Sequence, residues 1–146
     1  HYRFYGLGEY LTNGNYEKFR LEIKELLRNA ISFRDLKEEN SYHLFVIGLV
    51  SIMSETYFVK SNVESGDGIP DLVLKPKDKN KKAFIFEFKY SRAKDSRNLK
   101  RTAKSALKQI NDRNYAEGLK YEGYENIVKI GMGFRKKDVE VAVEEE

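Results

Sequence analysis

Two carboxylates and one ammonium group interrupt apolar segments in the middle of the chain. Asp71 lies in the segment IPDLVL, and Glu87 and Lys89 lie two residues apart in AFIFEFKY. Because side chains alternate along a strand, Glu87 and Lys89 are expected to point to the same face. Buried charges are costly unless they are paired or bind a metal. Carboxylate oxygens suit Mg²⁺, and such an ion can activate water and stabilise charge on a phosphodiester.

Each of these residues also has an ordinary interpretation. Glu87 and Lys89 could form a solvent-facing pair on an edge strand, where alternating charges are common. Asp71 could cap a turn after Pro70. Both interpretations together are the weaker alternative, because the predicted sheet places the three residues side by side. Glu64, at the end of the preceding predicted strand, is more often an ordinary surface acid than a ligand.

The elements that must position these residues follow from the hydrophobic pattern. Apolar stripes at helical spacing predict helices over 15–30, 41–57 and 97–111. Alternation and short apolar runs predict strands over 57–64, 69–74, 83–90, 126–134 and 138–143. Strand 83–90 has four aromatic residues on one face, which predicts a central position. The order of elements predicts an α/β fold with a mixed central sheet flanked by helices.

The segment after the central strand combines a packing surface with positive charge. In helix 97–111, an apolar stripe is expected to face the core, and Gly131 and Gly133 of strand 126–134 would allow close approach of backbone or a helix. A second stripe on this helix is basic and consists of Arg97, Arg101, Lys104 and Lys108. We expect this stripe to follow a nucleic-acid backbone.

The distribution of charge also favours an anionic partner. The net charge of the chain is +4, but residues 75–108 hold thirteen basic and three acidic residues, a net of +10, and the remainder carries −6. Nucleic acid is the first candidate for such a basic block. The alternative is a solvated, lysine-rich turn followed by the outer face of a helix.

Composition restricts the remaining classes of protein. A length of 146 residues fits one domain, and the absence of cysteine excludes disulfides and thiolate chemistry. No signal peptide or membrane span is evident, which suits a cytoplasmic protein, and a first residue of His1 suggests a fragment or a processed chain. We expect a helical lead-in over 1–40, a core over 41–143 and a disordered acidic tail over 144–146.

The motif Pro70-Asp71, fifteen residues and then Glu87-Phe88-Lys89 resembles that of the PD-(D/E)XK nuclease superfamily. The surrounding elements resemble its restriction-endonuclease-like αβββαβ core, preceded here by an extra N-terminal helix. The stretches 38–43, 61–68 and 106–110, followed by Tyr115, resemble one subfamily. This is the nuclease-like domain found C-terminal to an AAA-ATPase-like domain in bacterial proteins, and the resemblance covers roughly 33–143.

The resemblance implies a role for individual residues. Asp71 and Glu87 would hold Mg²⁺ or Mn²⁺, with the Phe88 carbonyl as a further ligand. Lys89 would orient or deprotonate the attacking water. Glu64 would be an additional acid bound through water, or Glu55 would replace it. Gln109 and Tyr115 would support the site or contact the nucleic acid. Many members have arginine directly before the aspartate, where this chain has Pro70.

The resemblance therefore implies a Mg²⁺-dependent deoxyribonuclease. It also implies an AAA-ATPase-like domain of the same full-length protein as a partner. The alternative is a catalytically inactive module that binds nucleic acid or another protein within a larger ATPase-linked protein, because a fold can persist after its chemistry is lost.

Overall fold

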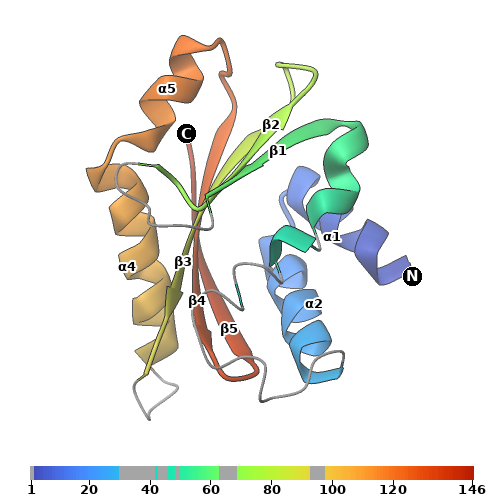
Figure 1. Ribbon diagram of the computed structural model, residues 1–146, viewed down its shortest axis with the longest axis vertical. Coiled ribbons are helices and arrows are strands. Elements are labelled where there is room, and N and C mark those ends of the chain that lie inside the picture. Colours follow the sequence, from blue (N-terminus) through green and yellow to red (C-terminus); the bar gives the residue numbers. More distant parts are fainter. Residues whose placement is uncertain (1, 30–41, 43–45, 49, 63–68, 93–97) are drawn as a thin grey trace.

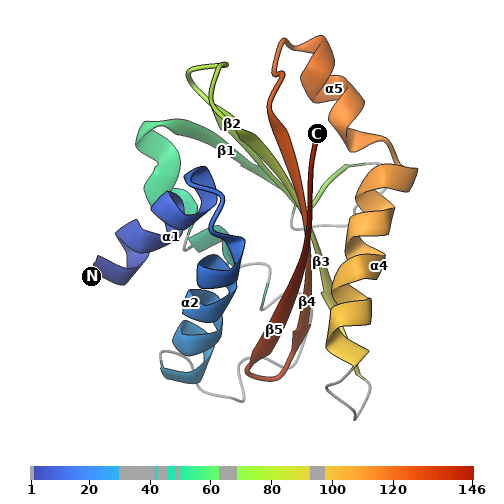
Figure 2. The same cartoon turned by 180° about the vertical axis from the view of Figure 1, so that it is seen from behind.

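The computed structural model describes residues 2–29, 42, 46–48, 50–62, 69–92 and 98–146. Within these residues, one mixed sheet lies between two groups of helices (Figures 1 and 2). Its strands are β1 (Tyr57–Ser61), β2 (Leu72–Pro76), β3 (Ala83–Tyr90), β4 (Ile127–Arg135) and β5 (Asp138–Glu145). They follow one another in the sheet in chain order. The β3–β4 pair is parallel and the other pairs are antiparallel, so a crossover must connect β3 to β4.

The predicted α/β fold is confirmed, and the N-terminal helices cover one face of the sheet. Helix α2 (Tyr16–Asn29) confirms the helix predicted over 15–30. Helix α1 (Tyr2–Thr12) precedes it and was not predicted. Gly6 and Gly8 weaken the helical signal of this segment, because glycine disfavours helix. Leu7 and Leu11 are nevertheless buried, so packing stabilises α1.

The helix predicted over 41–57 is only partly described. Tyr42, Val46 and Val50 are helical and buried, which agrees with the predicted stripe. The chain then continues as the 3-10 helix η2 (Ser51–Glu55), and β1 begins at Tyr57. The prediction of one helix as far as residue 57 is therefore wrong at its C-terminal end.

The aromatic face of β3 builds the main core, as its pattern predicts. Phe84, Phe86 and Phe88 are buried against the N-terminal helices, and the Phe19 and Phe86 rings lie 6.2 Å apart between centroids. The Tyr42 ring stacks on Phe134 at 4.7 Å. Because β3 lies between β2 and β4, its predicted central position is confirmed.

Helix α4 (Leu99–Asp112) covers the opposite face and packs directly on β4. A Cβ at Gly131 would overlap the Ala103 carbonyl oxygen and the Leu107 amide nitrogen, and one at Gly133 would lie 2.9 Å from the Ala103 amide nitrogen. The predicted close approach at these glycines is therefore confirmed. It brings the backbone of α4 down onto the sheet beside Glu87.

A short helix, α5 (Tyr115–Tyr121), completes the crossover and was not predicted. Asn114 has a left-handed backbone (φ 56°) and separates α5 from α4. Gly118 interrupts the helical signal of this segment. Ala116 and Leu119 pack with Val73 and Ile85 in a second, smaller core cluster.

The C-terminal glutamates belong to the sheet, so the prediction of a disordered tail over 144–146 is wrong. Strand β5 continues to Glu145, two residues beyond the predicted end. The Lys129 ammonium lies 3.3 Å from a Glu144 carboxylate oxygen and 2.7 Å from one of Glu146. This cation offsets the repulsion of the three adjacent acids.

Within the described part of the chain, none of the helices combines the length and the apolar character that crossing a bilayer requires.

Candidate active site

Asp71 and Glu87 are in direct contact on the sheet face that α4 covers. Asp71 lies immediately before β2 rather than in it, because the strand begins at Leu72. Leu72 pairs with Phe86 in the antiparallel register, which places the preceding Asp71 opposite Glu87. The Asp71 amide donates to Glu87 Oε1 (3.1 Å), and the Phe88 amide donates to Asp71 Oδ2 (2.8 Å). Each carboxylate is therefore fixed by the backbone of the other segment.

Helix α4 holds the side chains of β3 through two contacts one turn apart. Gln109 Nε2 donates to Glu87 Oε2, and Lys89 Nζ donates to Ser105 Oγ (3.2 Å). Two residues along a strand span about 6.6–6.8 Å, and four along a helix span about 6 Å, so the two spacings match. Gln109 is thus placed at the carboxylate pair. Ser105 was not predicted, although its position four residues before Gln109 is a signal that could have found it.

Burial and like charge both act on Glu87. Its side chain is 4% exposed, and desolvation followed by the nearby charge of Asp71 raises its pKa to about 7. The hydrogen bond from the Asp71 amide and the positive charge of Arg113 lower the pKa but do not cancel this rise. The pair therefore places a carboxyl group that titrates near neutrality beside a second acid.

The carboxylate pair suits a hard divalent cation. It offers carboxylate oxygens, the ligands preferred by Mg²⁺, and two like charges that a cation would neutralise. Among the residues that the structure describes, no group of three or more His, Cys, Asp or Glu side chains could hold a metal. The remaining positions would fall to water, which Mg²⁺ usually keeps, and to the Phe88 carbonyl, which stays a prediction.

The other predicted acids do not join this pair. Glu64 lies outside the described residues. Glu55 ends η2 and is exposed, as an ordinary surface acid would be. The structure therefore brings together two of the predicted metal ligands, Asp71 and Glu87, and leaves the additional acid as a prediction.

The basic stripe lies on the outer face of α4. Arg101, Lys104 and Lys108 are exposed, whereas Ala103 and Ala106 of the same helix are buried. Arg97 lies outside the described residues. The exposed positions can meet an anionic partner without competing with the apolar stripe for the sheet.

Tyr115 lies apart from the basic stripe. It begins α5, is half-buried, packs against the smaller core cluster and accepts a hydrogen bond from Arg113 (3.5 Å). The predicted nucleic-acid contacts are therefore placed on two different elements, α4 and α5.

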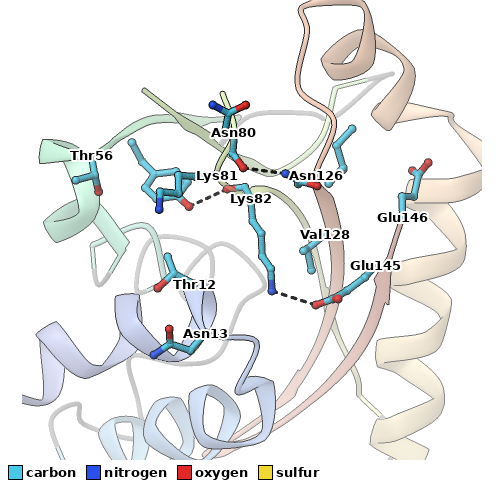
Figure 3. Close-up of a pocket in the computed structure, with 12 residues that line it drawn as sticks. Thr12, Asn13, Thr56, Asn80, Lys81, Lys82, Asn126, Val128, Glu145 and Glu146 are labelled. Atoms are coloured by element: carbon cyan, nitrogen blue, oxygen red, sulfur yellow. Dashed lines mark hydrogen bonds and ion pairs between the residues drawn. The ribbon is translucent and has the colours of Figure 1, made fainter. Parts of the chain in front are cut away.

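Figure 3 shows a cavity that is lined by other residues and has a volume of about 640 Å³. Its wall includes residues of the α1–α2 turn, the β2–β3 turn and the end of β5. Lys82 Nζ lies 3.4 Å from Glu145 Oε1, and Asn126 donates to the Asn80 carbonyl (2.8 Å). Neither Asp71, Glu87 nor Lys89 lines this cavity, so its size does not make it the candidate site.

Comparison with known proteins identifies a family for most of the chain. A family model described as PD-(D/E)XK nuclease superfamily matches residues 37–144, a range that includes the carboxylate pair, Lys89 and all of α4. No curated protein and no solved structure matches the chain significantly.

Proposed function

The chain belongs to the PD-(D/E)XK nuclease superfamily, and from this premise we propose that it is a metal-dependent nuclease that hydrolyses phosphodiester bonds in DNA. The observation that carries the proposal is the contact between Asp71 and Glu87, with Lys89 on the same face of β3. The exposed basic stripe of α4 supports DNA as the substrate, because cations of this kind bind phosphate backbones.

Each residue of the site has a chemical role in this proposal. Asp71 and Glu87 would hold Mg²⁺ or Mn²⁺, with the Phe88 carbonyl and water as further ligands. The ion supplies Lewis acidity and lowers the pKa of bound water. Lys89 orients the attacking water and stabilises the negative charge that develops on the phosphate. Gln109 fixes the orientation of the Glu87 carboxylate through its amide.

A purely structural role explains the carboxylate pair poorly. Two acids in contact under a helix oppose folding unless a proton or a cation lies between them. Titrating groups with strongly shifted pKa values are concentrated at functional sites. The raised pKa of Glu87 therefore supports a site that binds a cation.

The direct test is DNA cleavage in Mg²⁺ by Asp71→Asn, Glu87→Gln and Lys89→Met. We expect each variant to lose at least about a hundredfold in rate, as the removal of a positioned acid–base group does. Circular dichroism checks that the variants are folded. Asp78→Asn is the matched control, because Asp78 lies in the exposed β2–β3 turn and Asn can keep its side-chain acceptor for the Asn80 amide. Equal cleavage by the parent and the site variants would refute the proposal.

Thermal melting separates this proposal from the inactive module. Mg²⁺ or Mn²⁺ should raise the melting temperature of the parent by mass action on the folded state, and Asp71→Asn should lose that rise. The absence of any rise with either ion would favour the module. The AAA-ATPase-like partner domain is proposed from the sequence resemblance alone.

A further inference from the structure

A groove of about 340 Å³ continues the sheet face on which the carboxylate pair lies. Val73 and Ile85 line it. Val73 follows Asp71 by two residues, and Ile85 precedes Glu87 by two, so both share the face of the pair. The step along the sheet from the carboxylates to this floor is about 7 Å, which is comparable to one nucleotide unit. A nucleic-acid strand with one phosphate at the carboxylate site would therefore extend over the groove.

The walls of the groove suit a flat, apolar group attached to a charged backbone. Tyr115, Gly118 and Leu119 of α5 form one side, and Ile69 and Pro70 form the rim beside Asp71. Ile69 is a large apolar side chain that is 55% exposed. Aromatic and apolar surfaces of this kind accept the face of a nucleobase, and this contact tolerates any base because every base has a π-face.

Lysines flank the apolar surface. Lys75 and Lys60 also line the groove. Lys75 is 2.9 Å from Glu122, which holds its ammonium at the α5 side. Lys60 is exposed on β1 and can approach a phosphate. Glu122 also lines the groove and neutralises Lys75, so the groove offers an apolar centre with one net positive charge at its edge, that of Lys60. This arrangement is complementary to a base and an adjoining phosphate.

We propose that this groove holds one unstacked base of a single-stranded nucleic acid, beside the phosphate that would meet a cation held by Asp71 and Glu87. This inference rests on the proposed nuclease function. In a duplex, a base reaches such a groove only after it is unpaired and unstacked, which costs free energy. The protein should therefore bind single strands more tightly than a duplex of the same sequence.

Gly118→Leu tests the proposal by filling the groove. A Cβ at Gly118 would meet no atom of the described part of the chain within 4 Å, so a larger side chain can enter without displacing the backbone. Leucine also favours helix more than glycine, so α5 should remain folded. We expect binding of a single-stranded oligodeoxynucleotide to weaken about fivefold or more, since base stacking contributes this much in other proteins. Binding is measured by fluorescence anisotropy in Mg²⁺, with Lys89→Met in every protein compared so that the oligonucleotide is bound and not cleaved.

Two controls isolate the base. Gly48→Leu is the matched variant, because Gly48 is also helical and exposed, and a Cβ there would meet no atom of the described residues within 4 Å. Its helix packs on the other side of the sheet. It should bind like the parent. A strand of equal length made of abasic deoxyribose phosphates should bind the parent and Gly118→Leu equally. Tyr115→Leu, which keeps apolar contact and removes the ring, should weaken binding only of the strand with bases.

The outcomes distinguish this inference from the proposed function. If Gly118→Leu binds the single strand as tightly as the parent, or loses affinity for the abasic strand equally, the groove does not hold a base. If Gly118→Leu gives either of these results and the parent still cleaves DNA in Mg²⁺, the groove assignment is wrong and the proposed nuclease function stands. Base-dependent binding by a parent that does not cleave would overturn the nuclease proposal and retain the groove.

Discussion

Glu87 and Lys129 are both buried charged side chains on the α4 side of the sheet, yet their surroundings differ. Lys129 is 8% exposed and is paired with the carboxylates of Glu144 and Glu146, while Asn111 Oδ1 accepts a third hydrogen bond from it (2.7 Å). Glu87 is 4% exposed and has another carboxylate, Asp71, as its neighbour. The two residues are only two positions apart across the β3–β4 pair, where Lys129 is the partner of Ile85 and Gly131 that of Glu87.

The difference shows which buried charge the fold itself needs. The two carboxylates around the Lys129 ammonium offset the cost of burying its charge, and these ion pairs hold the end of β5 to the sheet. For Glu87, the cost of burial and the repulsion by the neighbouring carboxylate are not offset until a proton or a cation binds. The C-terminal end of α4 thus contacts both charges, the structural one through Asn111 and the reactive one through Gln109, two residues earlier.

The largest expected effect comes from a substitution that forces α4, the helix that covers both charges, away from the sheet. Gly131→Ala should destabilise the protein by at least about 4 kcal/mol, because the added Cβ would overlap backbone atoms of Ala103 and Leu107 that cannot move aside. Urea denaturation measures the change. Gly118→Ala is the control, since that position is open, and it should be neutral or stabilising. Gly131→Ala with the stability of the parent would mean that α4 does not rest on the sheet as described.

The next largest effect is the pH dependence of stability that Glu87 should cause. The pKa of Glu87 is about 7 in the folded protein and near its ordinary value of 4.5 when unfolded, so the folded state binds more protons between these values. The stability of the parent should therefore fall as pH rises from about 4.5 to about 7. Glu87→Gln has no carboxyl group to titrate, so its stability should not fall over this pH range. It should be more stable than the parent by about 2–3 kcal/mol at pH 8 and differ little from it near pH 4.

Denaturation in EDTA over this pH range tests the effect, with the exposed Glu125→Gln as control. The control should keep the pH dependence of the parent. A Glu87→Gln variant with an unchanged pH dependence would show that the carboxyl group is solvated, and the contrast with Lys129 would then lose its basis.

Part of the carboxylate site could be predicted from the sequence because it depends on local geometry. The period of two along 83–90 places Glu87 and Lys89 on one face. The apolar run around Asp71 predicts a strand over 69–74, and the observed strand begins three residues later, immediately after Asp71. The contact of Asp71 with Glu87 needs only the antiparallel pairing of two nearby segments. Gly131 and Gly133 likewise signal close approach of a helix.

The rest depends on contacts that no local pattern contains. Three consecutive glutamates at the end of the chain resemble a disordered tail. Their partners Lys82, Lys120 and Lys129, all more than ten residues away in the sequence, show why they are ordered. Ser105 lies four residues before Gln109, but its contact with Lys89 also depends on how closely α4 packs on the sheet. Helix α5 and the groove that it lines depend on packing against Val73 and Ile85, since its own helical pattern is short.

The smallest expected effect concerns the structural charge. Lys129→Met removes a cation from Glu144 and Glu146, whose side chains are 45% and 23% exposed, so both carboxylates can regain water. We therefore expect a loss of about 1–2 kcal/mol, below the cost of leaving a fully buried charge unpaired. Hydrogen exchange should speed up in the last residues of β5. Lys120→Met, which removes a partner of Glu146 that is well exposed to solvent, should leave the stability close to that of the parent. A Lys129→Met variant more stable than the parent would mean that this buried charge, like Glu87, opposes folding, and the distinction between a structural and a reactive charge would then have to be abandoned.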